Sequence, residues 1–151
     1  MSRIVSKKKS DREDLKTFFA TDGRFKVVQR ILSRPRWLKM THVKDFLRKE
    51  DRDYAVAKYE KGGFDYAAAE ASDVESKVEM KALLEEACIL LGSNTSFYKD
   101  GVLGFDDLLY LPELRTVTLV EGLEWPKRLR NYVVSAHSKA NVATYFDNQI
   151  A

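Results

Sequence analysis

The residues of this 151-residue chain that could act as nucleophiles, redox centres or metal ligands are few and widely spaced. Cys88 is the single cysteine, and His42 and His137 are the two histidines. Neither histidine forms a metal-binding motif with a Cys, Asp or Glu, which argues against a zinc site. The sequence contains neither a nucleophile elbow nor a glycine-rich phosphate loop. We therefore predict no catalytic residue and no metal site in this chain.

Cys88 has two interpretations, an inert core cysteine or a redox centre. A reactive cysteine is an exposed thiolate, commonly at a helix N-terminus. Cys88 falls on the apolar stripe of a predicted helix over 64–91, near its C-terminus, where the helix dipole opposes a thiolate. We favour the core interpretation. A single cysteine cannot form an internal disulfide, so the chain is predicted to reside in a reducing cytoplasm.

The charged residues offer two further candidates for chemistry. Glu85-Glu86 and Asp106-Asp107 are adjacent carboxylates, which point to different helix faces, so solvation and helix capping explain them better than acid–base catalysis. Arg34, Arg36 and Trp37, with Lys39 and His42 nearby, form a basic-aromatic cluster that could stack a base or clamp a phosphate. We favour a structural interpretation, in which the tryptophan packs on the core and the arginines are solvated.

The basic residues are concentrated in the first half of the chain. Residues 1–61 carry 18 Lys and Arg against 9 Asp and Glu, whereas residues 62–151 carry 8 against 14. Such a basic half could bind nucleic acid. Because its basic residues are interleaved with apolar ones throughout, we favour charge complementarity between the two halves. No apolar run approaches the ~20 residues of a membrane span, so no membrane partner is predicted.

The elements that position these residues are predicted to be helices. Apolar residues recur at spacings of three and four, and no segment alternates with a period of two. The chain is therefore predicted to be all-α, with antiparallel helices packed as a bundle. The predicted helices cover residues 10–33, 41–50, a short segment that ends at Gly62-Gly63, 64–91, 104–120, a segment that begins at Pro126, and 140–150.

The predicted helix over 104–120 is the most apolar, with only a narrow polar strip, and organises the bundle. Gly104 is at its N-cap position, and Asp106 and Asp107 lie in its first turn. Pro112 lies inside the helix and is expected to kink it. Trp125-Pro126 then starts the next helix, with the proline at its first position.

This region resembles the C-terminal helical domain of the two-domain, glutathione-transferase-like glutaredoxins of the glutaredoxin 2 type. The residues that carry the resemblance are Gly104, Asp106-Asp107, Leu111-Pro112, Leu114-Arg115, Thr118-Leu119-Val120, Trp125-Pro126, Arg128 and Tyr132. The family usually has Ser or Thr at the cap, so Gly104→Ser is expected to be neutral or mildly stabilising. Upstream, Arg34-Pro35-Arg36-Trp37 resembles the family's Leu-Pro-Arg-Phe. The resemblance covers roughly residues 11–151.

The resemblance implies a glutathione-transferase C-terminal-like fold over residues 10–151. Residues 1–9 are predicted from the sequence itself to be a disordered start or a linker. The family's reaction is glutathione-dependent thiol–disulfide exchange, carried out by a Cys-Pro-Tyr-Cys motif in an N-terminal thioredoxin-like domain. This sequence lacks that motif. The implied partner is thus a thioredoxin-like glutaredoxin domain, in cis or in trans, facing residues 10–33 and 64–91. This chain alone is expected to be inactive and to bind no glutathione.

Three phenylalanines near the start of the chain are predicted to form a docking face for that partner. Phe18 and Phe19 are adjacent, so they point about 100° apart on a helix, and Phe25 continues the apolar surface two turns later. One side would pack on the central helix and leave the other for a partner. Two alternatives stay open: a free-standing protein-interaction module with the same fold, and a basic nucleic-acid-binding helical protein.

Overall fold

The computed structural model describes residues 12–40, 48–99 and 102–151. In the described residues the chain forms α-helices, one 3-10 helix and no strand, which confirms the all-α prediction. The elements are α1 (Glu13–Phe18), α2 (Arg24–Trp37), α3 (Lys49–Lys61), α4 (Tyr66–Ala71), α5 (Asp73–Leu91), α6 (Phe105–Val117), α7 (Lys127–Lys139) and η2 (Phe146–Asn148). No helix in this part of the chain is long and apolar enough to cross a membrane.

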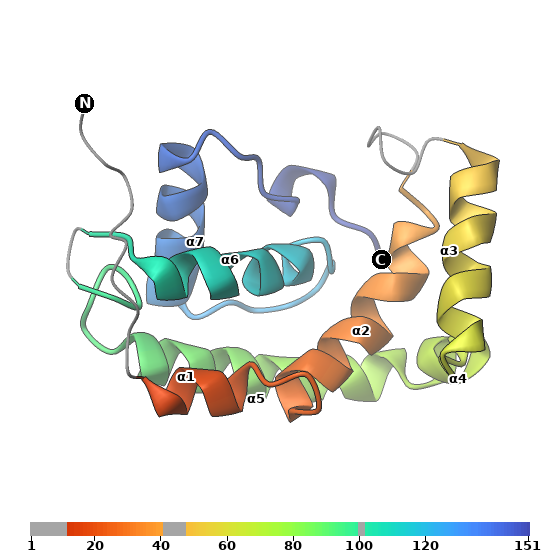
Figure 1. Ribbon diagram of the computed structural model, residues 1–151, viewed down its shortest axis with the longest axis horizontal. Coiled ribbons are helices and arrows are strands. Elements are labelled where there is room, and N and C mark those ends of the chain that lie inside the picture. Colours follow the sequence, from red (N-terminus) through yellow and green to blue (C-terminus); the bar gives the residue numbers. More distant parts are fainter. Residues whose placement is uncertain (1–11, 41–47, 100–101) are drawn as a thin grey trace.

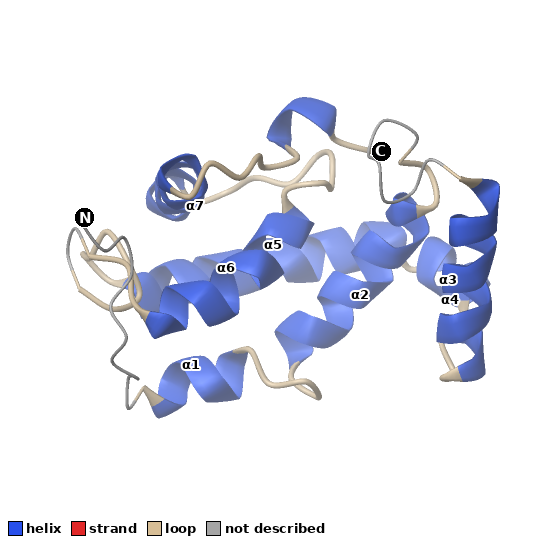
Figure 2. Ribbon diagram, turned by 45° about the horizontal axis from the view of Figure 1, so that its top comes forward, coloured by secondary structure: helices blue, strands red, loops and turns tan. Residues whose placement is uncertain are grey.

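The helices pack mainly around α2 and α5. The 19-residue helix α5 runs along one side of the molecule, and α2 crosses it and also contacts α4 and α6. Helix α7 packs on α5 and α6 at one end of the molecule, and α3 stands at the opposite end (Figures 1 and 2). Helix α6 is therefore held between α2 and α7.

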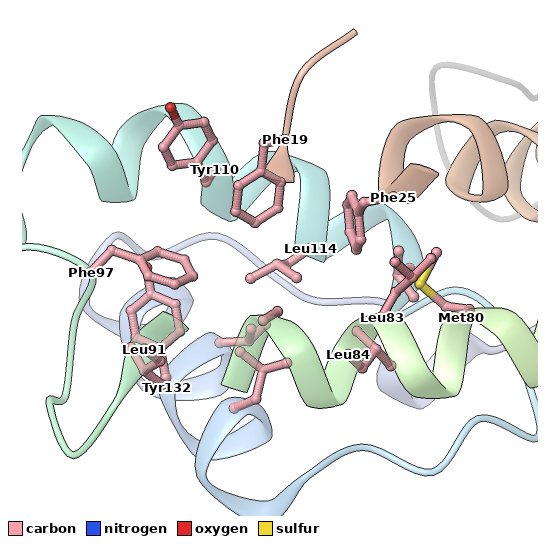
Figure 3. Packing of buried hydrophobic residues seen from close by; sticks show 14 of the residues in the cluster. Phe19, Phe25, Met80, Leu83, Leu84, Leu91, Phe97, Tyr110, Leu114 and Tyr132 are labelled. Carbon is pink, nitrogen blue, oxygen red and sulfur yellow. The ribbon is translucent and has the colours of Figure 1, made fainter. Parts of the chain in front are cut away.

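The core lies where α2, α5, α6 and α7 meet, and it is rich in aromatic rings (Figure 3). The ring of Phe19 stacks on that of Tyr110 with centroids 4.5 Å apart, and Phe97 meets Tyr132 edge to face at 5.1 Å. Leu114, on α6, is completely buried beside them. Aromatic pairs in these geometries stabilise a core beyond the area that they bury.

The helix predicted over 10–33 is two helices in the structure. Helix α1 ends at Phe18, and α2 begins at Arg24 after a turn in which the Gly23 N–H donates to the Ala20 carbonyl at 2.9 Å. A Cβ at Gly23 would lie 3.1 Å from the same oxygen, so glycine suits this tight turn. Helix α2 then continues through Pro35 to Trp37, beyond the end predicted at Ser33.

The helix predicted over 64–91 is also divided, at Ser72. Ser72 ends α4 and precedes α5, and its hydroxyl donates to the Ala69 carbonyl at 3.1 Å. Asp65 caps α4 by accepting from the Ala68 N–H at 3.0 Å, and Gly92 ends α5 at a φ of 67°, as its type predicts. Most of the helix predicted over 41–50 lies outside the described residues.

The helix predicted over 140–150 is wrong. Helix α7 ends at Lys139, Asn141 follows its C-cap with a φ of 54°, and only η2 is helical beyond it in the described residues. The terminal segment instead lies along the end of α6, where the Tyr145 N–H donates to the Thr118 hydroxyl at 2.9 Å. Ile150 pairs with Val120 in an isolated parallel bridge. These tertiary contacts outweigh the local helical pattern.

Candidate functional site

Asp107 joins three parts of the structure at the N-terminus of α6. Its carboxylate is 1 % exposed and accepts from the Gly104 N–H at 2.6 Å, the Phe97 N–H at 2.9 Å and the Tyr132 hydroxyl at 2.5 Å. The helix N-terminus also favours the negative charge. This carboxylate therefore fixes α6 to the preceding loop and to α7, which confirms the predicted capping role.

Tyr132 acts in this network as a permanent donor. Burial, together with the adjacent charge of Asp107, raises the pKa of the Tyr132 phenol far above its ordinary value. The phenol therefore keeps its proton at any physiological pH and donates a hydrogen bond to the Asp107 carboxylate. The neighbouring Asp106 is also buried, and one of its oxygens has no hydrogen-bond partner among the described residues.

Gly104 is at the N-cap of α6, as predicted, but the space around it argues against the expected tolerance of serine there. The backbone is extended, with a φ of −122°, so the conformation suits any residue. A Cβ at this position, however, would lie 2.5 Å from Cγ of Tyr98. Glycine is needed because the tyrosine ring passes directly over the cap.

The other residues predicted to be structural lie at element boundaries. Pro112 lies inside α6, and Pro126 is at the N-cap of α7, one position before the helical position predicted for it. Trp125 is half-buried and meets Phe146 edge to face at 5.3 Å, which holds the terminal segment against the loop after α6. Pro112, Trp125 and Pro126 therefore have structural positions.

The structure places two of the three phenylalanines of the predicted docking face in the core. Phe19 is 6 % exposed and Phe25 is 1 % exposed, so neither is available to a partner. The turn before α2 folds Phe18 and Phe19 back onto Phe25, with ring centroids 5.3 and 5.1 Å from it. Phe18 alone reaches the surface, where it lines a cavity of about 540 Å³ between α1 and α5.

The side of α6 that faces away from α2 and α7 is open and apolar. Leu108 is 56 % exposed, Leu109 is 47 % exposed, and Pro112 is exposed one turn further along the helix. At 100° per residue these three positions share one face, opposite the buried Tyr110 and Leu114. Leu108, Leu109 and Pro112 are called the open α6 face below. This face was not predicted, because the leucine-rich pattern of residues 104–120 indicated burial on almost every side of the helix.

Cys88 is half-buried and packs against the core from α5. A guanidinium nitrogen of Arg128 lies 3.9 Å from its sulfur and 3.2 Å from its carbonyl oxygen. His137, on α7, is 6 % exposed, with Nδ1 2.7 Å from the Val133 carbonyl oxygen, and its burial lowers its imidazole pKa. Among the described residues, no three His, Cys, Asp or Glu side chains form a metal-binding group.

The predicted basic-aromatic cluster is divided between two structural contacts. Arg36 is 3 % exposed and makes a bidentate ion pair with Asp73, at 2.6 and 3.0 Å. The guanidinium of Arg34 lies over the ring of Tyr59, 3.9 Å from its centroid, and Trp37 contacts the same ring. The contacts are structural, but the predicted solvation of the arginines is wrong, because Arg36 is buried in its ion pair and Arg34 packs on Tyr59. Lys39 lies at the surface, and His42 is outside the described residues.

The all-helical bundle of the described residues is the fold class of a glutathione-transferase C-terminal-like domain. The chain belongs to the family "Glutaredoxin 2, C terminal domain", whose model matches residues 22–149. No sequence among curated proteins matches the chain significantly.

A solved structure supports the fold independently. Glutaredoxin 2 from Salmonella typhimurium, determined in complex with glutathione, superposes with a TM-score of 0.79 at 20 % sequence identity. The match covers 97 % of this chain but 64 % of that chain, so this chain corresponds to less than two thirds of the relative. The fold predicted from the resemblance is therefore confirmed.

Proposed function

We propose that this chain is the helical docking partner of a thioredoxin-like glutaredoxin domain, supplied in cis or in trans. The observation that carries the proposal is the open α6 face, where Leu108 and Leu109 are about half exposed on the central helix. Exposed apolar surface of this kind commonly marks an interaction site. The part of the Salmonella glutaredoxin 2 chain outside the match, 36 % of its length from the 64 % covered, supports a domain-sized occupant.

In this proposal the redox chemistry belongs to the partner. Glutathione-dependent disulfide exchange needs a reactive thiolate, and the single cysteine here is half-buried beside the core. This chain would stabilise the partner and shape the cleft where glutathione binds, and it would bind no cofactor alone. A reducing cytoplasm is the compartment that suits such chemistry.

The test is a titration of the isotope-labelled chain with the thioredoxin-like domain of a glutaredoxin 2, followed by NMR. We expect the largest shifts along the open α6 face. Leu109→Asp should weaken binding at least about tenfold, because it removes a buried leucine from the interface and puts a charge there. Val134→Asp is the matched control, since Val134 is 42 % exposed on α7, outside both the open α6 face and the helices predicted to face the partner.

Equal weakening by both variants, or shifts confined to α5, would overturn this docking surface. A coupled glutathione assay tests whether the redox activity belongs to the partner domain and not to this chain. The chain alone should show no disulfide reductase activity, and activity that Cys88→Ser removes would contradict the proposal. If the thioredoxin-like domain fails to bind at all, the free-standing interaction module becomes the better explanation.

A further inference from the structure

A polar groove lies between α7 and the loop that follows α5, away from the open α6 face. It encloses a cavity of about 300 Å³. Its α7 wall is formed by Arg128, Asn131, Ser135 and Lys139, which are spaced by three, four and four residues and so share one helix face. The opposite wall is formed by the loop that begins at Ser93 and Asn94.

Five polar side chains of this groove are exposed to solvent. They are those of Ser93, Asn94, Asn131, Ser135 and Lys139. The groove thus presents amide and hydroxyl groups, which can both donate and accept, along most of its length. Such groups pair best with a ligand that also carries both donors and acceptors.

The charge of the groove differs from that of its surroundings. Residues 62–151 carry 8 Lys and Arg against 14 Asp and Glu, yet the described lining residues include two cations and no carboxylate. Arg128 and Lys139 are 11 positions apart on α7, about 16 Å along the helix axis. One small anion cannot contact both, so the pattern suits a ligand with negative groups near its two ends.

The floor of the groove is formed by a buried, hydrogen-bonded side chain. It includes Tyr132, which is 4 % exposed and whose hydroxyl is held by Asp107. At one end, Arg128 donates to the Cys88 carbonyl at 3.2 Å, which holds its guanidinium against the end of α5. These bonds tie the α7 wall to Asp107 and to the end of α5, and such preorganisation lowers the entropy cost of binding.

We propose that this groove binds a short, extended peptide segment with an acidic residue near each end. An extended chain of about five residues spans the 16 Å between the two cations. Its backbone amides would pair with the asparagine and serine side chains, and its carboxylates with Arg128 and Lys139. An oligophosphate carries only acceptors and would leave the asparagine carbonyl groups unpaired. The proposal is independent of the docking function assigned to the open α6 face.

The probe is an acetylated and amidated pentapeptide of sequence Asp-Gly-Ser-Gly-Asp, titrated into the labelled chain and followed by NMR and calorimetry. We expect saturable binding, with shifts at Asn131 and Ser135. Lys139→Gln should weaken binding about fivefold, the effect of one partly exposed ion pair. The peptide with Asn in place of both Asp residues should bind much more weakly.

Lys127→Gln is the matched control, because Lys127 is an exposed cation on the same helix that lines a different cavity. It should change the affinity less than twofold if the groove is the site. Equal effects of the two lysine variants would show long-range attraction only and overturn the proposal. Tighter binding of linear tripolyphosphate than of the peptide, or shifts outside the groove, would overturn the peptide assignment.

Discussion

Asp107 shows how one side chain can determine the arrangement of several elements. The family resemblance and its place in the first helical turn predicted a cap from sequence, and the Gly104 N–H bond confirms it. The bonds from Phe97 and Tyr132 were not predictable, because they join residues 10 and 25 positions away through the fold. The carboxylate of Asp107, which was a candidate for acid–base catalysis because it is paired with Asp106, is therefore explained by helix capping and tertiary hydrogen bonds.

Gly104→Ser should destabilise the domain by about 1–3 kcal/mol, the range for an added group in a packed site. A Cβ there would lie 2.5 Å from Tyr98 Cγ and 2.6 Å from its Cβ, which are not the flexible end of that side chain. Displacing the tyrosine would disturb the cap that Asp107 makes. Chemical denaturation of the variant and the parent chain measures the difference.

Tyr98→Ala in the same chain should recover part of that loss, since it removes Cγ and Cδ1 of the ring but keeps Cβ. A double-mutant cycle gives the coupling. Gly62→Ser is the control, because a Cβ at Gly62 meets only the carbonyl oxygens of Tyr59 and Lys58, at the ordinary contact distances of 3.4 and 3.8 Å. A fully stable Gly104→Ser variant would mean that serine caps α6 without steric conflict.

At the scale of elements, the sequence predicted which segments are helical better than where each helix is interrupted. Gly62 and Gly92 end helices as their type suggests. The break at Ser72 carries no glycine or proline, and it depends on packing of α4 and α5 against α2. Pro35 does not end α2, because a proline in the last turn removes few hydrogen bonds.

Helix α3 is held to the rest of the domain by few contacts. It has no buried residue, and Arg34 of α2 lies over its Tyr59, 3.9 Å from the ring centroid. Arg34→Ala should therefore free α3 while α2 stays folded. Cation–π contacts of this kind contribute about 1–2 kcal/mol, so amide exchange in α3 should become roughly 5–30 times faster. Hydrogen-exchange mass spectrometry resolves α3 from the core.

Lys58→Ala provides the comparison for this prediction. Lys58 lies over the same ring at 5.8 Å but comes from α3 itself, so its loss removes no contact between helices. Exchange in α3 should change little in that variant. If both variants accelerate exchange equally, or if α5 is affected as much as α3, then Arg34 does not anchor the helix.

At the scale of the whole molecule, sequence periodicity could not separate surfaces that face the core from surfaces that face a partner. Both are apolar, and the difference depends on how the chain turns. The turn at Gly23 buries Phe19 and Phe25, whereas the packing of α6 between α2 and α7 leaves Leu108 and Leu109 open. The class of fold was predictable from the resemblance, but the exposure of this face of α6 became visible only in the structure.

The C-terminal segment is held against the helical bundle by the buried side chain of Arg36. The Arg36 Nε donates to the Ile150 carbonyl at 2.9 Å, and the Ile150 N–H donates to the Leu119 carbonyl at 2.8 Å. Arg36 also pairs with Asp73 of α5. One side chain thus ties α2 to α5 and to the end of the chain, although these residues are far apart in sequence.

This closure predicts an energetic coupling between Arg36 and the last three residues. Arg36→Ala and removal of Gln149–Ala151 should each destabilise the domain, because each leaves polar groups of the same junction without partners. Together they should cost about 1 kcal/mol less than the sum, since both remove the contact between Arg36 and Ile150. Arg30→Ala is the control, because Arg30 lies on the same helix but donates to the Thr21 carbonyl. Its effect should add fully to that of the truncation in urea denaturation. Strict additivity for Arg36 as well would show that the terminal segment is held by its apolar contacts and that the arginine serves only Asp73.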